Sequence, residues 1–175
     1  MVSRRVFMVL VLVGAFVLAG VIVGGLTLLV NTHSYPAPET ETPLEYEQTT
    51  VTVVDSDSGD QLGQVEATVA DTWRKRYTGL SKTESLPENR GMLFTYDSEG
   101  SHTYVMRGMS FGIDIVYVAA NGTITRIHHA PEPPENADGE DYEYPGTGQY
   151  VLEVNYDWTT RHNVTEGDRV ELGDV

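Results

Sequence analysis

An uncharged stretch near the N-terminus constrains this chain more than any other feature. Residues 6–30 read VFMVLVLVGAFVLAGVIVGGLTLLV, 25 residues without one charged side chain. As a helix, this stretch would rise by roughly 37 Å, which is enough to cross the hydrocarbon core of a bilayer, about 30 Å thick. We therefore expect a single transmembrane helix over residues 6–30.

The charges around this stretch predict its orientation. Arg4 and Arg5 precede it, and the next Lys or Arg is Arg74. Because positive charge is retained on the cytoplasmic side, residues 1–5 are predicted to be cytoplasmic and the rest of the chain extracytoplasmic. A cleaved signal peptide is the alternative, but its apolar region usually spans about 7 to 15 residues. We therefore expect a single-pass protein of the cell membrane, and the possibility of cleavage stays open.

Small residues recur within the same stretch. Gly20 and Gly24 form a GxxxG step, and small residues at this spacing let two membrane helices approach closely. Glycine is also common in membrane helices that do not pair, so the step alone does not fix an oligomeric state. The sequence is thus compatible with a weak homodimer through Gly20 and Gly24, alongside the membrane contact of residues 6–30.

The rest of the chain divides into a linker and one domain. Residues 31–50 are acidic and rich in Pro and Thr, with too little apolar content to pack, so they are expected to be a disordered tether. Residues 51–175 are then enough for one hydrophobic core and too few for two. We expect them to form a single domain.

The net charge of that domain limits the classes of molecule that it can bind. The chain has 26 Asp and Glu against 11 Lys and Arg, a net charge of -15. Nucleic acid is therefore excluded as a partner, because phosphate binding needs a basic surface. An acidic, lysine-poor composition suits a protein from a high-salt environment, where repulsion is screened, although an ordinary acidic extracellular domain has the same character. There is no Cys, so packing alone must stabilise the fold.

The first part of the domain shows turn and cap signals. Residues 51–54 and 61–70 flank the turn sequence DSDSG, which predicts a β-hairpin. Asp71 and Thr72 can cap a short helix. In that helix we expect a buried stripe at helical spacing, made by Trp73, Tyr77 and Leu80.

The second part predicts further strands and one long loop. Strands are expected near residues 92–96, 103–106, 113–119 and 124–129, with Asn-Gly at 121–122 as a hairpin turn between the last two. Residues 130–148 are acidic and contain Pro and Gly, so we expect a loop. Final strands are predicted at residues 150–154 and 169–172.

The order of several motifs resembles a known family. The segments are ADTWRKRYTGL (70–80), LPENRGMLFTY (86–96), YVMR (104–107), IDIVY (113–117), YVLEV (150–154) and GDRV (167–170). Together, over residues 51–172, they resemble the family called domain of unknown function 192. The resemblance implies a mainly β fold, a small antiparallel β-barrel-like domain with one or two short helices, often exported or anchored. It implies no assigned activity.

Asp114 is the main candidate for chemistry. If residues 121 and 122 form a two-residue turn, Val116 faces Ile127, Val118 faces Thr125 and Asp114 faces His129. Asp114 then lies on the apolar side of the sheet, where a carboxylate needs a cation or several donors, so we expect a partner among His129, Arg76 and Arg107. The conservative interpretation is that such a pair only fixes the loop 107–112 onto the barrel.

Two function classes follow from these residues. The first is a non-catalytic outer-face module that binds a small ligand or an envelope partner, with five candidate ligand-binding residues: Asp114, Arg76, Arg107, Met106 and His129. The second is an enzyme that uses Asp114 as acid or base with Arg76, Arg107 or His129. The first is favoured, because the sequence shows no convincing nucleophile, metal cage or phosphate loop.

The sequence indicates no metal site and no cofactor, but it contains two possible glycosylation sites. His128 and His129 are neighbours in a predicted strand and point to opposite faces, so we expect no metal site there, and no motif indicates a cofactor. Asn163 and Asn121 each begin an Asn-x-Thr sequence, which makes both candidates for N-glycosylation. Asn163 is preferred, because modification at Asn121 would have to tolerate a tight turn.

Overall fold

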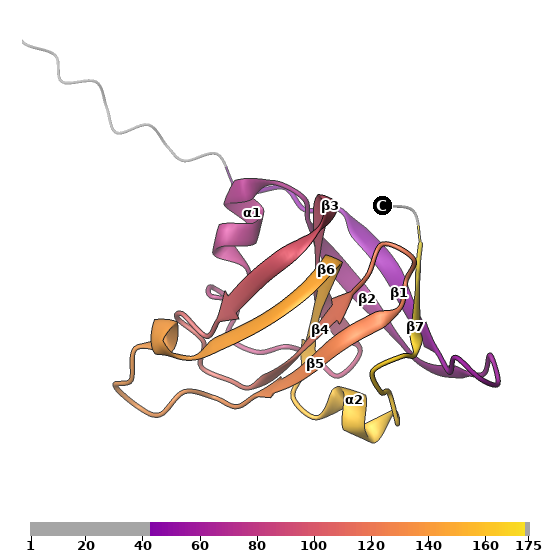
Figure 1. Ribbon diagram of the computed structural model, residues 1–175. Coiled ribbons are helices and arrows are strands. Elements are labelled where there is room, and N and C mark those ends of the chain that lie inside the picture. Colours follow the sequence, from indigo (N-terminus) through magenta and orange to yellow (C-terminus); the bar gives the residue numbers. More distant parts are fainter. Residues whose placement is uncertain (1–42, 174–175) are drawn as a thin grey trace, which may run out of the picture. The chain divides into compact units, whose positions relative to one another are not determined.

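The computed structural model describes residues 43–173 (Figure 1). The predicted membrane span at residues 6–30, the Gly20 and Gly24 contact and most of the tether lie outside the described residues. Within residues 43–173, neither the length nor the apolar character needed to cross a membrane is found in any helix. Of the tether, residues 48–50 already belong to the first strand.

The domain is mainly β, as predicted, with seven strands and short helical segments. In chain order these are β1 (Gln48–Val54), β2 (Gln61–Ala70), α1 (Trp73–Thr78), β3 (Arg90–Val105), β4 (Ile113–Val118), β5 (Ile124–Ala130), the 3-10 turn η1 (Gly139–Asp141), β6 (Glu143–Asn155), α2 (Trp158–Arg161) and β7 (Arg169–Leu172). The strands form one sheet in the order β5-β4-β6-β3-β2-β1-β7. Only β2 and β3 pair in parallel among the described strands.

The two edges of the sheet meet at one corner, which gives the domain its barrel-like curvature (Figure 1). A bridge joins Thr123, just before β5, to Arg169 of β7. Backbone hydrogen bonds from Ile124 N to Asp168 O, at 2.8 Å, and from Val170 N to Gly122 O, at 2.8 Å, reinforce it. Because the edge strands are joined here, part of each edge is protected from pairing with another chain.

The predicted hairpin between β1 and β2 is confirmed. Its turn is organised by Asp55, whose Oδ1 accepts hydrogen bonds from the backbone N–H groups of Asp57 at 3.0 Å and Ser58 at 2.7 Å. Gly59 completes the reversal with φ of 75°, a conformation that glycine adopts without steric cost. The turn thus forms through the residue types that predicted it.

The helix α1 is where predicted, but its predicted buried stripe is wrong. Thr72 caps it, since its hydroxyl accepts a hydrogen bond from Lys75 N. Leu80 is buried, whereas Trp73 is 70% exposed and Tyr77 58% exposed. The side that faces the sheet is instead held by Arg76, whose Nη1 donates to Thr95 O at 2.8 Å. A helix of six residues is too short to bury a full apolar stripe when one guanidinium takes that side.

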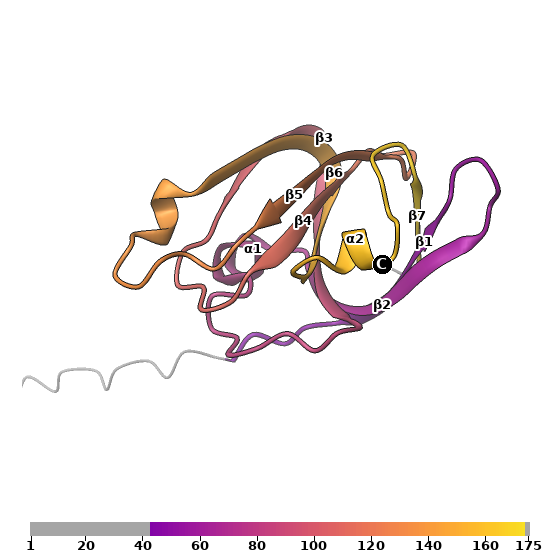
Figure 2. The same cartoon turned by 90° about the horizontal axis from the view of Figure 1, so that it is seen from below.

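β3 and β6 are longer than expected. Two strands near residues 92–96 and 103–106 were predicted, yet β3 is one strand of 16 residues. Its pairing with β6 becomes irregular between Thr95 and Gly100 and then resumes, and both strands curve strongly (Figure 2). The predicted loop 130–148 is therefore too long, because β6 already begins at Glu143. The polar sequence of residues 97–102 resembles a turn, and pairing with a distant strand overrides it.

The hairpin between β4 and β5 has the predicted register over most of its length. Val116 pairs with Ile127 and Asp114 with His129, as expected, but Val118 pairs with Ile124 instead of Thr125. The turn is longer than two residues, because Gly122 N donates to Ala119 O at 2.9 Å and Gly122 has φ of 88°. A bulge near Tyr117 then restores the predicted alignment.

Every residue of β4 is buried, so the strand contributes to two hydrophobic clusters on opposite faces of the sheet. The first cluster includes Val116, Val118 and Trp158. The second includes Ile115 and Tyr117 and is partly covered by side chains from the far half of β3. The candidate polar residues must therefore be placed on one face or the other.

Candidate functional site

Asp114 lies at the end of the first cluster and is fully buried, as its place on the apolar side predicted. Its Oδ1 contacts His129 Nδ1 at 2.8 Å and accepts from Asp157 N at 3.1 Å. Its Oδ2 accepts from Thr159 N at 2.9 Å and from Thr159 Oγ1 at 2.6 Å. The predicted contact with His129 is confirmed, and both oxygens of Asp114 are occupied.

These contacts fix a different segment from the one expected. The donors to Asp114 come from residues 157 and 159, which lie at the start of α2, and not from the loop 107–112. Asp157 has φ of 59°, so the chain reverses sharply at the point where Asp114 holds it. The geometry indicates an anchor for this turn. Asp114, His129 and Asp157 also place ligand-type atoms within 4.8 Å of one another, but the oxygens of Asp114 already accept hydrogen bonds.

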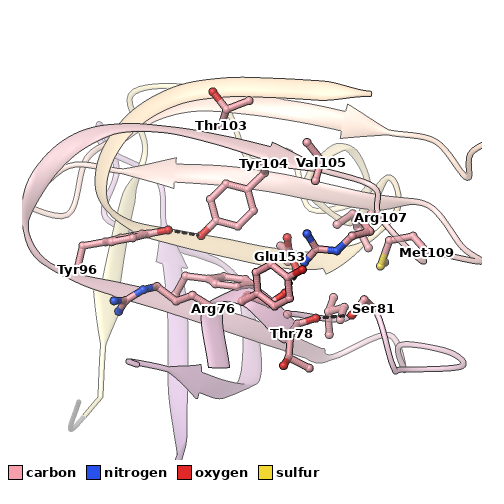
Figure 3. Close-up of a pocket in the computed structure, with 15 residues that line it drawn as sticks. Arg76, Thr78, Ser81, Tyr96, Thr103, Tyr104, Val105, Arg107, Met109 and Glu153 are labelled. Carbon is pink, nitrogen blue, oxygen red and sulfur yellow. Dashed lines mark hydrogen bonds between the residues drawn. The ribbon is translucent and has the colours of Figure 1, made fainter. Parts of the chain in front are cut away.

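A cavity of about 220 Å³ lies on the other face of the sheet, between α1, β3 and the loop after β3 (Figure 3). It is lined by Arg76, Tyr77, Thr78, Gly79, Leu80, Ser81, Phe94, Tyr96, Thr103, Tyr104, Val105, Arg107, Met109, Ile113 and Glu153. Its size is below the roughly 300–1,000 Å³ of sites for drug-sized ligands, so it suits a small molecule.

Glu153 is the most unusual group in this cavity. It belongs to β6, directly between the buried residues Leu152 and Val154, and is itself 5% exposed. Within residues 43–173 its carboxyl group makes no hydrogen bond and no ion pair. Burial raises the pKa of Glu153 to about 8, because no donor compensates the loss of water around the charged form. The group is therefore mostly protonated at neutral pH.

Arg76 reaches the cavity from α1 and Arg107 from the loop after β3 (Figure 3). Arg76 Nη1 donates to the carbonyl groups of Asp71 at 2.7 Å and Thr95 at 2.8 Å, and its guanidinium lies 4.9 Å from the centre of the Tyr96 ring. No carboxylate within residues 43–173 pairs with it. Its direct partners within the described residues are carbonyl dipoles and a π face, and the Asp71 carboxylate acts on it at longer range.

Arg107 is held in a similar way. Its Nη2 donates to Tyr77 O at 2.5 Å, and its guanidinium lies 4.1 Å from the centre of the Tyr77 ring. An exposed carboxylate, Glu140, lies 3.3 Å from Nη1. Both guanidiniums are thus fixed in position before any ligand arrives, which lowers the entropic cost of using them.

Aromatic side chains form much of the remaining wall. The hydroxyl groups of Tyr96 and Tyr104 are hydrogen bonded at 3.0 Å, and Phe94 packs edge-on against Tyr104 with ring centres 4.9 Å apart. Burial raises the pKa of Tyr104 far above its ordinary value, so this phenol stays neutral. The cavity therefore combines π faces, one buried carboxyl group and two guanidiniums.

The structure divides the predicted ligand-binding residues between two places. Arg76 and Arg107 line the cavity, whereas Asp114 and His129 belong to the anchor on the other face. Met106 is fully buried in the second cluster and lines a separate surface crevice near residues 132–139. An enzyme that used Asp114 with Arg76 or Arg107 would need groups that the fold keeps apart, whereas Asp114 and His129 are in contact.

Glu153 was missed by the sequence analysis, although a signal was present. In the segment YVLEV a single acidic residue interrupts an apolar run that predicts a strand buried on both faces. A carboxyl group at such a position is costly, and its presence indicates either a partner or a function.

The remaining candidates lie outside the cavity. His128 Nε2 contacts Pro145 O at 2.8 Å, so the neighbouring histidines have separate partners, as alternation along a strand implies. Asn121 Oδ1 accepts from Thr123 N at 3.0 Å within the hairpin turn, and Asn163 is exposed with φ of 55°. Their glycosylation stays a prediction.

Comparison with known proteins agrees with this fold. The model of the family DUF192, described as "Uncharacterized ACR", matches residues 52–172. A crystal structure from Sinorhizobium meliloti, described provisionally as a transcription regulator, is 25% identical with a TM-score of 0.66 and covers 75% of this chain and 98% of its own. A protein of unknown function from Novosphingobium aromaticivorans is 24% identical with a TM-score of 0.61, covering 79% and 94%. No curated protein matches the chain.

Proposed function

The chain belongs to the DUF192 family of uncharacterised proteins, and from that premise we propose that it is a binding module for a small molecule in the cavity beside α1. One observation carries the proposal: Glu153 is buried, has no partner within residues 43–173, and lines a cavity that Arg76 and Arg107 also line. An unpaired polar group in a concave, partly apolar site is a common mark of ligand binding.

The similar protein from Sinorhizobium meliloti is described as a transcription regulator, but we do not infer DNA binding for this chain from that description. Residues 51–175 carry 9 basic and 22 acidic side chains, a net charge of -13. DNA would be repelled by such a domain, since nonspecific affinity for duplexes comes from contacts between phosphate and basic residues. We therefore do not transfer the description of the Sinorhizobium protein to this chain, and we propose a small molecule as its ligand.

The proposal places the module on the outer side of a membrane, anchored by residues 6–30. Arg4 and Arg5 before that stretch support this orientation. Protease added to intact cells should shorten the protein, whereas a cytoplasmic domain would be cut only after lysis. Full protection in intact cells would contradict the proposed location and would leave the binding proposal untouched.

The binding proposal is tested by filling the cavity. Met109 lines it and is partly buried, so Met109→Trp should occupy the space while keeping an apolar side chain there. Ser110→Trp, at the exposed next position and outside the cavity, is the matched control. A library of small metabolites, amines, acids and amides is screened by ligand-observed NMR against the full-length protein.

We expect at least one compound class to bind the wild type and Ser110→Trp equally, and to lose at least tenfold in affinity with Met109→Trp. If no class of small molecule binds, or if the affinity of every binder is unchanged by Met109→Trp, the cavity is not a ligand site.

A further inference from the structure

The buried carboxyl group of Glu153 predicts the charge of the ligand group that reaches it. A carboxylate that has lost its water regains stability when a cation or several donors approach it. The protein supplies none within residues 43–173, so the ionised form of Glu153 would gain stability from a ligand that brings such a group. An ammonium group provides both the opposite charge and hydrogen-bond donors.

The walls around Glu153 favour the same choice. Rings of Phe94, Tyr96, Tyr104 and Tyr77 line the cavity, and the face of an aromatic ring attracts cations. The protein already uses this attraction twice at the site, where a guanidinium lies over a tyrosine ring. Tyr96 is already contacted by Arg76 and His102, and Tyr77 by Arg107 and Trp73. An ammonium group inside the cavity would therefore meet mainly the rings of Phe94 and Tyr104 beside the carboxyl group.

The two guanidiniums exclude a simple amine. Arg76 and Arg107 both line the cavity, and a ligand with positive charge alone would be repelled by them. A carboxylate on the same molecule reverses this effect, because Arg binds carboxylates through charge-assisted hydrogen bonds. The side chain of Arg107 is 35% exposed, and its Nη2 and Nη1 donate to Tyr77 O and to the exposed Glu140. An incoming carboxylate can use the remaining N–H groups of this guanidinium or take the place of Glu140.

We propose that the ligand is a small zwitterion of the amino acid type, with its ammonium group against Glu153 and its carboxylate at Arg107. This inference rests on the proposed function, since it names the ligand class of the same cavity. A cavity of about 220 Å³ suits a molecule of this size. Figure 3 shows the two side chains that this assignment uses, Glu153 from β6 and Arg107 from the loop after β3.

Three matched probes separate the charges. L-Valine has both groups, isobutylamine keeps only the ammonium and isovalerate keeps only the carboxylate, on the same branched skeleton. Isothermal titration of the full-length protein with each probe should give an affinity for L-valine at least tenfold above that of either analogue. Glycine and L-phenylalanine extend the series to smaller and larger side chains.

Proton release provides an independent readout. At pH 7.5, Glu153 is mostly protonated, and an ammonium group that binds beside it should expel the proton. The groups facing it cannot supply that proton, since burial raises the pKa of Tyr104 and Tyr117 and the guanidiniums stay charged. His102, which stacks on Tyr96, has a pKa lowered by burial and is neutral at this pH.

Two substitutions test which residue binds the ammonium group of the ligand and which binds its carboxylate. Glu153→Gln should abolish the proton release and lower the affinity for L-valine at least tenfold, whereas Glu143→Gln, an exposed position on the same strand, should change neither. Arg107→Gln should weaken L-valine at least tenfold and leave isobutylamine unchanged or tighter.

Two results would overturn the ligand class. An affinity for isovalerate equal to or above that for L-valine would mean that the site binds anions, and the binding proposal would survive. If amino acids of all three sizes fail to bind while the library yields a binder sensitive to Met109→Trp, the zwitterion is refuted and the cavity is retained. Failure of the whole library refutes both proposals.

Discussion

Two buried carboxyl groups lie on neighbouring strands of this sheet, and within residues 43–173 only one of them receives hydrogen bonds. Asp114 of β4 pairs across from Val154 of β6, one residue away from Glu153. Asp114 receives three hydrogen bonds from the turn at residues 157–159 and contacts His129. Glu153 points to the other face and, within the described part of the chain, receives none.

We interpret this difference as one between an acid that stabilises the fold, Asp114, and an acid for which we propose ligand binding, Glu153. Burial alone does not distinguish them, because Asp114 is 0% exposed and Glu153 only 5% exposed. What distinguishes them is whether the fold supplies the donors that burial demands. The fold supplies them to Asp114 and leaves Glu153 facing a cavity, which is why we assign a stabilising role to the first and ligand binding to the second.

The largest effect is expected at the satisfied acid. Asp114→Asn should lower the free energy of unfolding by about 3 kcal/mol, because one oxygen is replaced by an amide that cannot accept from Thr159 or Asp157. Urea unfolding of the full-length protein measures this loss. Asp141→Asn, an exposed acid in η1, should stay within experimental error. A loss below about 0.5 kcal/mol would remove the contrast between the two acids.

The next effect has the opposite sign. Glu153→Gln should stabilise the protein by about 2 kcal/mol at pH 9, because the folded wild type must bury an ionised carboxylate at this position and the variant does not. The folded pKa of Glu153 is raised above its unfolded value, so the wild type loses stability from pH 4.5 up to about 8 as only the unfolded chain ionises.

The gain from Glu153→Gln should therefore disappear near pH 4, where the carboxyl group is neutral in both states. Thermal unfolding of both proteins across this pH range gives the difference directly. A constant difference from pH 4 to pH 9 would show that Glu153 titrates normally and has a partner.

The smallest effect concerns one donor of the anchor. Thr159→Ala removes the hydroxyl that donates to Asp114 Oδ2 and keeps the backbone bond, so it should cost about 1.5 kcal/mol. Thr160→Ala, at the exposed neighbouring position, is the control. In the background of Asp114→Asn, the Thr159→Ala change should cost clearly less, as a double-mutant cycle would reveal. Additive losses would mean that the hydroxyl stabilises α2 in another way.

Local signals predicted the parts of the fold that form locally. The turn at Asp55, the cap at Thr72 and the contact between Asp114 and His129 each depend on residues close in sequence or on strand alternation. The continuity of β3 was not predictable in this way, because residues 97–102 are polar and the ladder with β6, which is interrupted after Thr95, resumes only at Gly100. The same long-range pairing shapes the second cluster, over which the cavity forms.

The candidate site was predicted only in part for the same reason. Arg76 and Arg107 were candidates because either could have paired with Asp114, and neither does: both line the cavity on the other face. Sequence alone could not show that this face of β6 lies against them. Trp73 and Tyr77 were expected to be buried at helical spacing, whereas the sheet-facing side of α1 is occupied by Arg76. Which face of a short helix packs is decided by tertiary contacts, and no periodicity within six residues fixes it.

The strand order also governs how quickly this domain can form. Val51 of β1 pairs with Leu172 of β7, and Gly91 of β3 with Val154 of β6, so several ladders join segments far apart along the chain. Sheets dominated by such distant pairings fold in milliseconds to seconds, roughly a thousandfold slower than helical bundles. During that interval the apolar strands β4 and β6 are unprotected. Nascent chains should therefore be most vulnerable to aggregation and proteolysis before β7 joins the sheet, and assistance from chaperones should act mainly in that window.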